Sequence, residues 1–372
     1  MRKWLIAMGL LVLGCEQAPS ADLSSAVVAD GASFRVVEVA GGLEHPWGMA
    51  FLPSGDVLIT ERPGRLRILR NGVLDPTPIT GLPEIQASGQ GGLLDVALDP
   101  DFADNQLIYL SYAAFGDGGS GTHVARARLN GGALEDVEVI FEGFMGSGGR
   151  HFGSRLVFDQ DGYLYVTLGD RGDADRAQYL GDLAGKVVRL QPDGGVPQDN
   201  PFVGDGNAAP EVFSYGHRNP QGMTVHPETG AIWLVEHGPR GGDEVNVVKE
   251  GVNYGWPVIT YGRAYSGFSI GEGTEKEGMA QPAHYWVPSI SPSGMAFYEG
   301  DAFPEWQGDL FVGALSGDLL ARLEINGEEV TGEERLIEYT LGRIRDVRIG
   351  PDGLIYLLND QEEGALWRLE PA

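Results

Sequence analysis

One pattern recurs six times along this chain of 372 residues and limits what it can fold into. Each copy has a short aliphatic strand, a turn containing Pro, Gly or Asp, and a second strand of aliphatic and aromatic residues. The copies begin at Gly48, Leu94, Arg155, Gly222, Gly294 and Asp346. Such strand pairs cannot bury both faces alone, but stacking them radially buries those faces and leaves only short edges. The pattern predicts an all-β fold, a six-bladed β-propeller of four-stranded antiparallel blades; a β-sandwich of similar strand count has no reason to repeat six times.

The spacing of the copies indicates where function lies. Successive copies are about 46 to 72 residues apart, whereas a bare four-stranded blade needs only ~40–45. The surplus is expected in loops over the central channel, where propellers carry their functional residues. The last predicted strand is Ala365–Leu369, and Phe34–Val39 is expected to complete the same blade and close the ring.

The formal charge of −27 excludes two classes of partner. A nucleic-acid-binding protein carries a basic binding face, so no nucleic acid is expected as a partner. Attachment to anionic lipid through a basic patch is excluded for the same reason.

The first residues resemble a bacterial export signal. Met1–Lys3 is basic, and Trp4–Gly14 is apolar but too short to span a bilayer. The run Leu11-Val-Leu-Gly-Cys15 resembles a lipobox, so we expect a lipoprotein signal peptide over residues 1–14, lipidation of Cys15, a flexible tether over 15–32 and a propeller domain over 33–372. An ordinary cleaved secretory signal is the alternative. Either signal predicts export, to the periplasm or the cell surface, and a lipidated Cys15 would be the only attachment to a membrane.

Several loops carry polar residues that strands and turns do not require. Most of these loops stand just before the first strand of a copy, and equivalent positions in different blades converge on one end of the channel. The convergent set is Gln90, His151, Arg218, Asn219, Arg343 and Arg345. Three arginines in an acidic protein form a focused anion site, because guanidinium pairs with carboxylate or phosphate. A histidine beside such a site suits general-base chemistry.

These segments together resemble a known family of enzymes. The segments are Gly89-Gln90-Gly-Gly-Leu-Leu, His151-Phe-Gly-Ser-Arg155, Tyr215-Gly-His-Arg218-Asn219-Pro-Gln-Gly222, Gly238-Pro239…Asp243-Glu244…Asn253-Tyr254-Gly-Trp-Pro257 and Arg343-Ile-Arg345-Asp-Val347. They resemble the soluble PQQ-dependent aldose sugar dehydrogenases, the glucose/sorbosone dehydrogenase group of six-bladed propellers. The likeness runs from about residue 35 to 370.

The resemblance implies an activity and a set of roles. His151 is similar to the general base that removes the proton of the sugar C1 hydroxyl, while hydride passes to the quinone of pyrroloquinoline quinone (PQQ) and a lactone forms. Gln90, Arg218, Asn219, Arg343 and Arg345 match positions that hold PQQ or the aldose substrate. The backbone carbonyls of Gly238 and Pro239 match ligands of a catalytic Ca²⁺. Glu244 and the carbonyl of Tyr254 match ligands of a second, structural Ca²⁺. The particular sugar and the electron acceptor do not follow from the resemblance.

Two departures from the family pattern bear on this interpretation. Arg150 stands where an Asp precedes the catalytic histidine, which leaves the residue that orients His151 unassigned. Ser316 stands where a Lys usually contacts the cofactor, which removes one cation. Two alternatives therefore stay open: a non-catalytic sugar- or ligand-binding propeller, and a Ca²⁺-dependent lactonase. The lactonase would need several Asp, Asn and Glu side chains converging on one metal, whereas the convergent set here is cationic.

Overall fold

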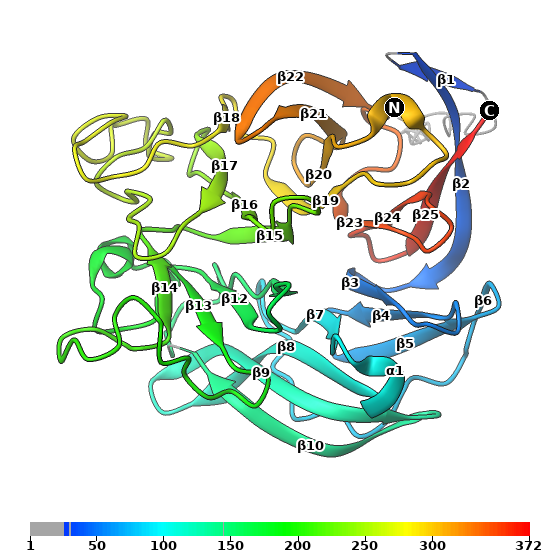
Figure 1. The fold of residues 1–372 in the computed structure, drawn as a ribbon, viewed down its shortest axis with the longest axis horizontal. Coiled ribbons are helices and arrows are strands. Elements are labelled where there is room, and N and C mark those ends of the chain that lie inside the picture. The colour runs from blue at the N-terminus through cyan, green and yellow to red at the C-terminus, as the bar shows by residue number, and fades with distance from the viewer. Residues whose placement is uncertain (1–25, 30, 144) are drawn as a thin grey trace, which may run out of the picture.

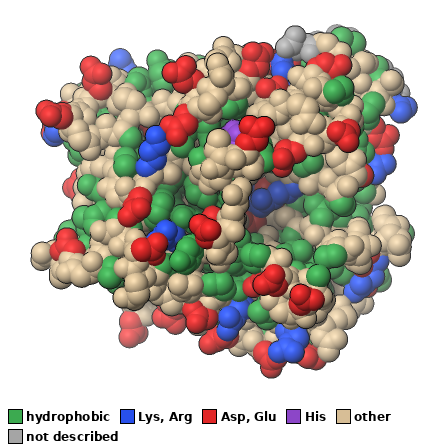
Figure 2. Space-filling model, in the orientation of Figure 1, with side chains coloured by type: hydrophobic (Ala, Val, Ile, Leu, Met, Phe, Trp, Pro, Cys, Tyr) green, Lys and Arg blue, Asp and Glu red, His purple; other side chains and the backbone are tan. Residues whose placement is uncertain are grey.

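The computed structural model describes residues 26–372 except 30 and 144. Six antiparallel sheets stand around a common axis, and the first strands of neighbouring sheets pack against one another near the middle (Figure 1). The predicted all-β, six-bladed propeller is confirmed. In the face shown in Figure 2, the middle of the ring is hollowed and cationic side chains lie in the hollow.

The blades follow the chain in order. The first blade contains β3 (Pro46–Phe51), β4 (Val57–Glu61), β5 (Arg65–Arg70) and β6 (Val73–Leu74). The second contains β7 (Leu93–Leu98), β8 (Leu107–Gly116), β9 (Gly119–Asn130) and β10 (Ala133–Glu142). The third contains β11 (Leu156–Phe158), β12 (Leu164–Leu168), β13 (Lys186–Leu190) and β14 (Val212–Tyr215).

The remaining blades complete the ring. The fourth contains β15 (Pro220–Val225), β16 (Ile232–Glu236), β17 (Asp243–Val248) and β18 (His284–Trp286). The fifth contains β19 (Pro292–Phe297), β20 (Leu310–Ala314), β21 (Leu320–Asn326) and β22 (Glu329–Leu336). The sixth contains β23 (Ile344–Ile349), β24 (Ile355–Asn359), β25 (Gly364–Pro371), β2 (Ala32–Leu43) and β1 (Val27–Ala29). The helical segments described are α1 (Phe102–Asn105) and the 3₁₀ turns η1 (Ala174–Gln178) and η2 (Pro304–Trp306), and among the described residues no helix is both long and apolar enough to cross a membrane.

The ring closes where the two ends of the chain meet. Strand β2 pairs antiparallel with β25, with Phe34 opposite Pro371 and Leu43 opposite Gly364, so the expected pairing of Phe34–Val39 with the last blade is confirmed. Strand β1 adds a fifth strand, and it falls inside the segment 15–32 that was predicted to be a tether. Ala29 is buried there and Val27 packs on the core, so the sheet begins before residue 33. The predicted signal peptide and Cys15 lie outside the described residues.

The second strand of each copy is apolar because it is buried on both faces. Every residue of β4, β12, β16, β20 and β24 is buried between neighbouring blades. This explains why these runs are mainly aliphatic and aromatic rather than alternating with polar residues.

A buried ionic network joins the blades at the axis. Arg155 lies 3.1 Å from Asp95 and 3.0 Å from Asp346, and Arg348 lies 3.2 Å and 3.1 Å from the same two carboxylates. Blades two, three and six therefore meet in one cluster. Glycine begins the neighbouring copies because a Cβ at Gly48 would lie 2.6 Å from Asp95 Oδ1, and one at Gly294 would lie 2.3 Å from Asp346 Oδ1. Close packing around the axis thus explains why these copies of the repeat begin with glycine.

Candidate active site

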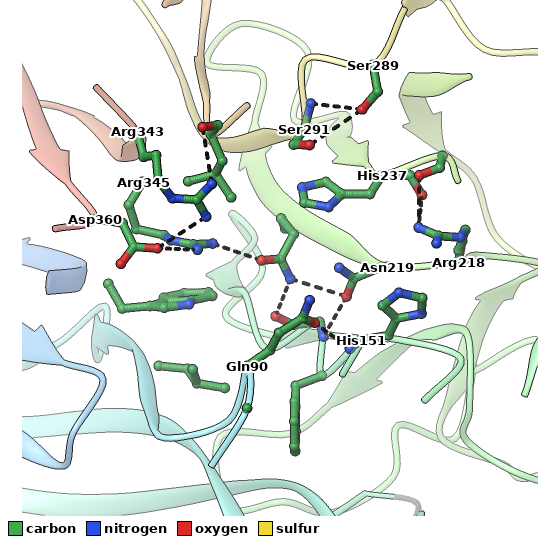
Figure 3. A pocket seen from close by; sticks show the side chains of 18 of the residues that line it. Gln90, His151, Arg218, Asn219, His237, Ser289, Ser291, Arg343, Arg345 and Asp360 are labelled. Atoms are coloured by element: carbon green, nitrogen blue, oxygen red, sulfur yellow. Dashed lines mark hydrogen bonds and ion pairs between the residues drawn. The ribbon is translucent and has the colours of Figure 1, made fainter. Parts of the chain in front are cut away.

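The loops that precede the first strands surround one cavity of about 370 Å³. All six residues of the predicted convergent set line it: Gln90, His151, Arg218, Asn219, Arg343 and Arg345. Figure 3 shows Arg343, Arg345 and Asp360 gathered on one side and His151, Arg218 and His237 on the opposite side. The structure therefore brings a histidine and a group of cations to one place from the third, fourth and sixth blades, with the Gln90 amide from the second.

His151 is held from two directions. Its backbone N–H donates to Gln90 Oε1 at 2.7 Å, and its ring Nδ1 lies 2.6 Å from Asp170 Oδ1. The backbone φ of His151 is +55°, a region that non-glycine residues occupy rarely, so these contacts fix a conformation that the loop alone would not favour. Asp170 is thus the orienting residue that the sequence left unassigned.

The protonation states follow from the partners of Asp170. Burial opposes ionisation of Asp170, but hydrogen bonds from His151, from the Gly172 amide and from Trp256 Nε1 hold its pKa below the ordinary value. An ionised carboxylate only accepts hydrogen bonds, so Nδ1 of His151 carries the proton and Nε2 keeps its lone pair. Burial also lowers the pKa of His151, against the bond from Asp170 and together with the charge of Arg218. The ring is therefore a neutral base at the cavity wall.

The opposite wall is cationic. Arg345 donates to Asp360 at 2.8 Å and to Gln221 at 3.0 Å, and the Arg343 guanidinium lies 3.6 Å from the same Asp360 carboxylate. Burial opposes ionisation of Asp360, but Arg345 and His45 hold its pKa well below the ordinary value. Two guanidinium groups therefore share one carboxylate. The Nε of Arg345 is buried and has no hydrogen-bond partner among the described residues, so this wall retains capacity for an anion.

Arg218 is set by a buried chain of hydrogen bonds. Its backbone N–H donates to Glu236 Oε2 at 2.6 Å, while the other oxygen of Glu236 lies 2.8 Å from His217 Nδ1. His217 in turn lies 2.9 Å from the hydroxyl of Ser214 and does not line the cavity. The Arg218 guanidinium donates to the carbonyls of His237 and Gly238 at 3.1 and 2.9 Å. No carboxylate pairs with it in the described part of the chain, so its charge is available to a ligand.

Gly238 and Pro239 also line this cavity, as predicted for backbone ligands of a metal. Asp243 holds their loop, because one oxygen accepts from the Gly238 amide at 2.8 Å and the other from the amides of Ile290 and Ser291. Within the described residues, no group of three or more His, Cys, Asp or Glu side chains is placed to hold a metal ion. A cation here would rely on carbonyl oxygens and on a ligand that completes its coordination.

Glu244 and Tyr254 do not line the main cavity but an adjacent one of about 10 Å³, bordered by Gly238. That volume holds one water-sized sphere. Burial raises the pKa of Glu244 to about 8, helped by the neighbouring Glu236. Asn246 donates to both carboxylates, at 3.1 and 3.3 Å, while its own Oδ1 is buried without a partner in the described structure. A cation in this small cavity would satisfy the carboxylate oxygens of Glu244 and Glu236.

His237 was not predicted to act, yet it lines the cavity opposite the arginine pair. Its Nε2 lies 2.7 Å from the carbonyl of Pro292 and donates to it. Burial lowers its pKa to about 3, and the charge of Arg218 acts in the same direction. His237 is therefore a neutral positioning contact between the fourth and fifth blades.

The two departures from the family pattern have different consequences. The Arg150 side chain lies against Gly172 and lines a second, more open cavity of about 700 Å³ beside the first. The hydroxyl of Ser316 lies 2.8 Å from that of Ser291, which lines the main cavity. Neither departure displaces His151 or the arginines.

A signal for the missing Asp170 was present in the repeats. Acidic residues end the second strand or follow it within two positions in four blades: Glu61, Asp170, Glu236 and Asp360. Each lies within 2.8 Å of the nitrogen of a basic side chain. Aligning the ends of the second strands, as was done for the loops before the first strands, would have found it.

The comparisons with known proteins agree with this architecture. The family described as Glucose / Sorbosone dehydrogenase matches residues 43–368. The chain belongs to this family. Glucose/sorbosone dehydrogenase membership makes it an oxidoreductase of the sugar dehydrogenase type, so the resemblance predicted from the sequence is confirmed.

Three relatives place the chain within the glucose/sorbosone dehydrogenases. The aldose sugar dehydrogenase of Escherichia coli is 47% identical over 94% of this chain and 96% of that protein, and its apo crystal structure superposes with a TM-score of 0.89 over 91% of this chain and all of that one. The PQQ-bound aldose sugar dehydrogenase of Streptomyces coelicolor is 28% identical, with a TM-score of 0.76 over 92% of this chain and all of that one. The quinoprotein glucose dehydrogenase B of Acinetobacter calcoaceticus is 26% identical over 87% of this chain and 84% of that protein.

Proposed function

We propose that this protein oxidises the C1 hydroxyl of aldose sugars to lactones with PQQ as redox cofactor and Ca²⁺ as metal. One observation carries the proposal. A neutral histidine, oriented by an ionised carboxylate, faces a cavity whose other wall is made of incompletely paired arginines. A base and an anion site in one cavity are what this chemistry needs.

The residues present fit PQQ. PQQ is a planar quinone with three carboxylates, and the cavity offers Arg218 without a carboxylate partner and Arg345 with an orphaned buried Nε among the described residues. The cavity volume of about 370 Å³ lies within the range of small-molecule sites. Gln90 and Asn219 add amide groups to the same wall as His151, and Trp47 supplies an aromatic face. PQQ is named in the Streptomyces relative's structure, which supports the assignment.

Each residue of the site would have its own role in the reaction. PQQ, when bound, supplies an electrophilic quinone carbonyl that accepts hydride. Nε2 of His151 takes the proton of the C1 hydroxyl, and Asp170 stabilises the imidazolium that results. Arg218, held by Glu236 through its backbone, places positive charge where negative charge develops.

Two places in the structure offer oxygen ligands for Ca²⁺, and they differ in how many they offer. The carbonyls of Gly238 and Pro239 are hard oxygen donors at the cavity wall, but Ca²⁺ takes six to eight oxygens, so the cofactor and solvent would complete that site. The Glu244 site offers the carboxylates of Glu244 and Glu236 and the backbone of Tyr254 around a space of one ion. The chemistry of both donor sets suits Ca²⁺.

The test of the proposed function is reconstitution. The purified protein is titrated with PQQ and Ca²⁺ while reduction of a dye is followed with a panel of aldoses. Aldose-dependent reduction that requires PQQ supports the proposal. PQQ binding without turnover of any aldose would favour a non-catalytic binding propeller instead. The lactonase alternative is not favoured, because no cluster of acidic side chains is placed for a metal in the described residues.

The arginines give a prediction about cofactor affinity. Replacing Arg345 or Arg218 with alanine should weaken PQQ binding by about 1.5–3 kcal/mol, which corresponds to roughly 10- to 100-fold, because each removes a charged hydrogen bond to a carboxylate or quinone oxygen. Titration of PQQ into apo-protein, followed by quenching of tryptophan fluorescence, measures the change. Arg128→Ala is the matched control, since Arg128 pairs with Asp136 on the exposed outer surface. Unchanged affinity in both cavity variants would mean that PQQ binds elsewhere.

The Glu244 site gives a prediction about stability. Ca²⁺ that binds only the folded state should raise the melting temperature of PQQ-free protein by a few degrees, as mass action requires. A chelator should reverse the gain. Glu244→Gln removes the carboxylate that would bind the ion but keeps the shape, so calorimetry should show little response to either Ca²⁺ or chelator. Equal responses in the variant and the wild type would contradict this ligand assignment.

Export and lipid attachment remain proposals from the sequence. The signal over residues 1–14 and Cys15 predict a lipid-anchored protein of the periplasm or cell surface. Cys15→Ser should release the protein into the soluble periplasmic or culture fraction, whereas an ordinary secretory signal predicts a soluble protein with or without this change.

A further inference from the structure

The lysines and arginines of this protein differ in whether they pair with a carboxylate. Most lysines and arginines in the described residues lie within 4.0 Å of a carboxylate. The exceptions in that part of the chain are Arg62, Arg150, Arg171, Lys186, Arg218, Arg240 and Arg263. In a chain of charge −27, an unpaired cation is unusual, so the position of each exception calls for a physical reason.

Two of the exceptions are explained by backbone contacts. Lys186 is fully buried and donates to the carbonyls of Arg176, Ala177 and Ala184. Arg171 is buried as well, donates to the carbonyls of Gly148 and Arg150, and lies over the ring of Phe152. Both side chains satisfy carbonyl groups of loops and are closed to a ligand.

The other exceptions gather around the cavity. Arg62 and Arg218 line it directly. Arg150 directly precedes His151, Arg240 directly follows Pro239, and Arg263 begins a small hairpin, bridged to Ser269, whose tip residue Tyr265 lines the cavity. Arg150, Arg240 and Arg263 are exposed, and Arg62 is partly exposed. The Arg150 side chain, however, lines the second cavity rather than this one. We call Arg62, Arg240 and Arg263 the entrance arginines.

The entrance arginines lie on both sides of the cavity. Arg62 donates to the carbonyl of Gly89, so it belongs to the Gln90–His151 side. Arg240 and Arg263 belong to the Pro239 side, where Gly262 packs against Pro239. Cations at the mouth of a cleft in an otherwise acidic surface focus the field there and raise the association rate of anions by ~10- to 1,000-fold.

We propose that the entrance arginines select an anionic electron acceptor, a proposal that rests on the proposed function. Aldoses are neutral and gain nothing from these charges. A bound PQQ would have its carboxylates met by the inner arginines, Arg218, Arg343 and Arg345. Each sugar oxidised leaves two electrons and two protons to be removed before the next turnover. An anionic one-electron oxidant removes the electrons in two encounters, and the protons pass to water.

Steady-state kinetics of the PQQ- and Ca²⁺-loaded protein test the proposal. The acceptors are ferricyanide, a neutral benzoquinone and the cationic N-methylphenazinium ion, each over a range of ionic strength. For wild type, kcat/KM for ferricyanide should fall steeply with salt, that for benzoquinone should stay flat, and that for the phenazinium should rise. Arg240→Glu combined with Arg263→Glu should lower kcat/KM for ferricyanide about tenfold or more at low ionic strength and leave that for benzoquinone within about twofold.

A matched variant distinguishes an effect of the charges at the entrance from an effect of the protein's net charge. Arg128→Glu with Arg335→Glu makes the same change in charge on exposed outer strands, where both arginines pair with carboxylates. It should change kcat/KM for ferricyanide far less than the entrance variant. Equal effects of the two double variants, or equal salt dependence for all three acceptors, would overturn the proposal. Loss of kcat/KM for glucuronic acid, but not for glucose or ferricyanide, would overturn it in favour of an acidic sugar as the anion.

A binding measurement decides the proposal without turnover. Hexacyanocobaltate(III) is redox-inert and has the shape and charge of ferricyanide. Calorimetry on the apo-protein should show weaker binding in the entrance variant than in wild type or in the Arg128/Arg335 variant. Equal affinity in all three proteins would place the anion only at the inner arginines and overturn the proposal. If no aldose is oxidised, the proposed function fails, while this measurement still tests the entrance.

Discussion

His151→Ala is expected to slow sugar-dependent reduction of an acceptor by about 10²–10⁴-fold, the usual contribution of a general base. The substituted side chain leaves the arginine wall intact, because the hydrogen bonds of Arg345 and Asp360 lie on the other side of the cavity. The affinity of the apo-protein for PQQ should therefore stay near that of wild type. Single-turnover kinetics with PQQ already bound separate the two effects.

The pH dependence of the wild-type rate is a second test of His151 as the general base. Only the neutral imidazole accepts a proton, so the rate should fall as the pH drops through the pKa of His151. Burial and Arg218 lower that pKa, so the acid limb should lie below the ordinary histidine value of ~6.5. His237→Ala is the control, because His237 lines the same cavity but donates its Nε2–H to Pro292. If His237→Ala lost turnover and His151→Ala kept it, the base would be His237.

The blades could be predicted from the sequence because their cause is local. A second strand buried on both faces must be mainly apolar, and this shows in five of the copies, for example in Val57–Glu61 and Ile355–Asn359. The convergence of Gln90, His151, Arg218 and Arg345 followed from the symmetry of the ring, since equivalent loops meet at one end of a channel. Neither step required knowledge of side-chain contacts.

The features that the sequence did not predict depend on contacts between segments that are far apart in the chain or on elements too short to show a pattern. Asp170 contacts His151 across 19 positions and is fixed by Trp256 from the fourth blade, a pairing that no local pattern encodes. The fifth strand β1 was missed because Val27–Ala29 is short and follows residues rich in Ala and Ser. The separate place of Glu244, beside rather than inside the main cavity, arises from the pairing of β16 with β17, which sets Glu236 opposite Glu244.

Asp170→Asn is expected to have an effect nearly as large as loss of the base itself. One carboxylate oxygen accepts from His151 Nδ1 and the Gly172 amide, and the other accepts from Trp256 Nε1. An asparagine must turn its NH₂ toward one of these donors. If the NH₂ faces His151, the proton moves to Nε2 and the ring can no longer act as a base. The expected fall in kcat is about 10²–10⁴-fold, with PQQ affinity near that of wild type.

The pH profile distinguishes this positioning role from a merely structural one. The bond from Asp170 raises the pKa of His151 against the effect of burial, so its loss should lower that pKa further. The acid limb of kcat in Asp170→Asn should therefore move to lower pH while the plateau falls. Trp256→Phe is the matched variant: it removes one bond to Asp170 but leaves the carboxylate beside His151, so its plateau should fall much less and its acid limb should stay close to that of wild type. An acid limb of Asp170→Asn that stays in place or moves to higher pH would show that the Asp170 carboxylate does not support the charged ring of His151, because any loss of rate would then come from disturbed packing alone.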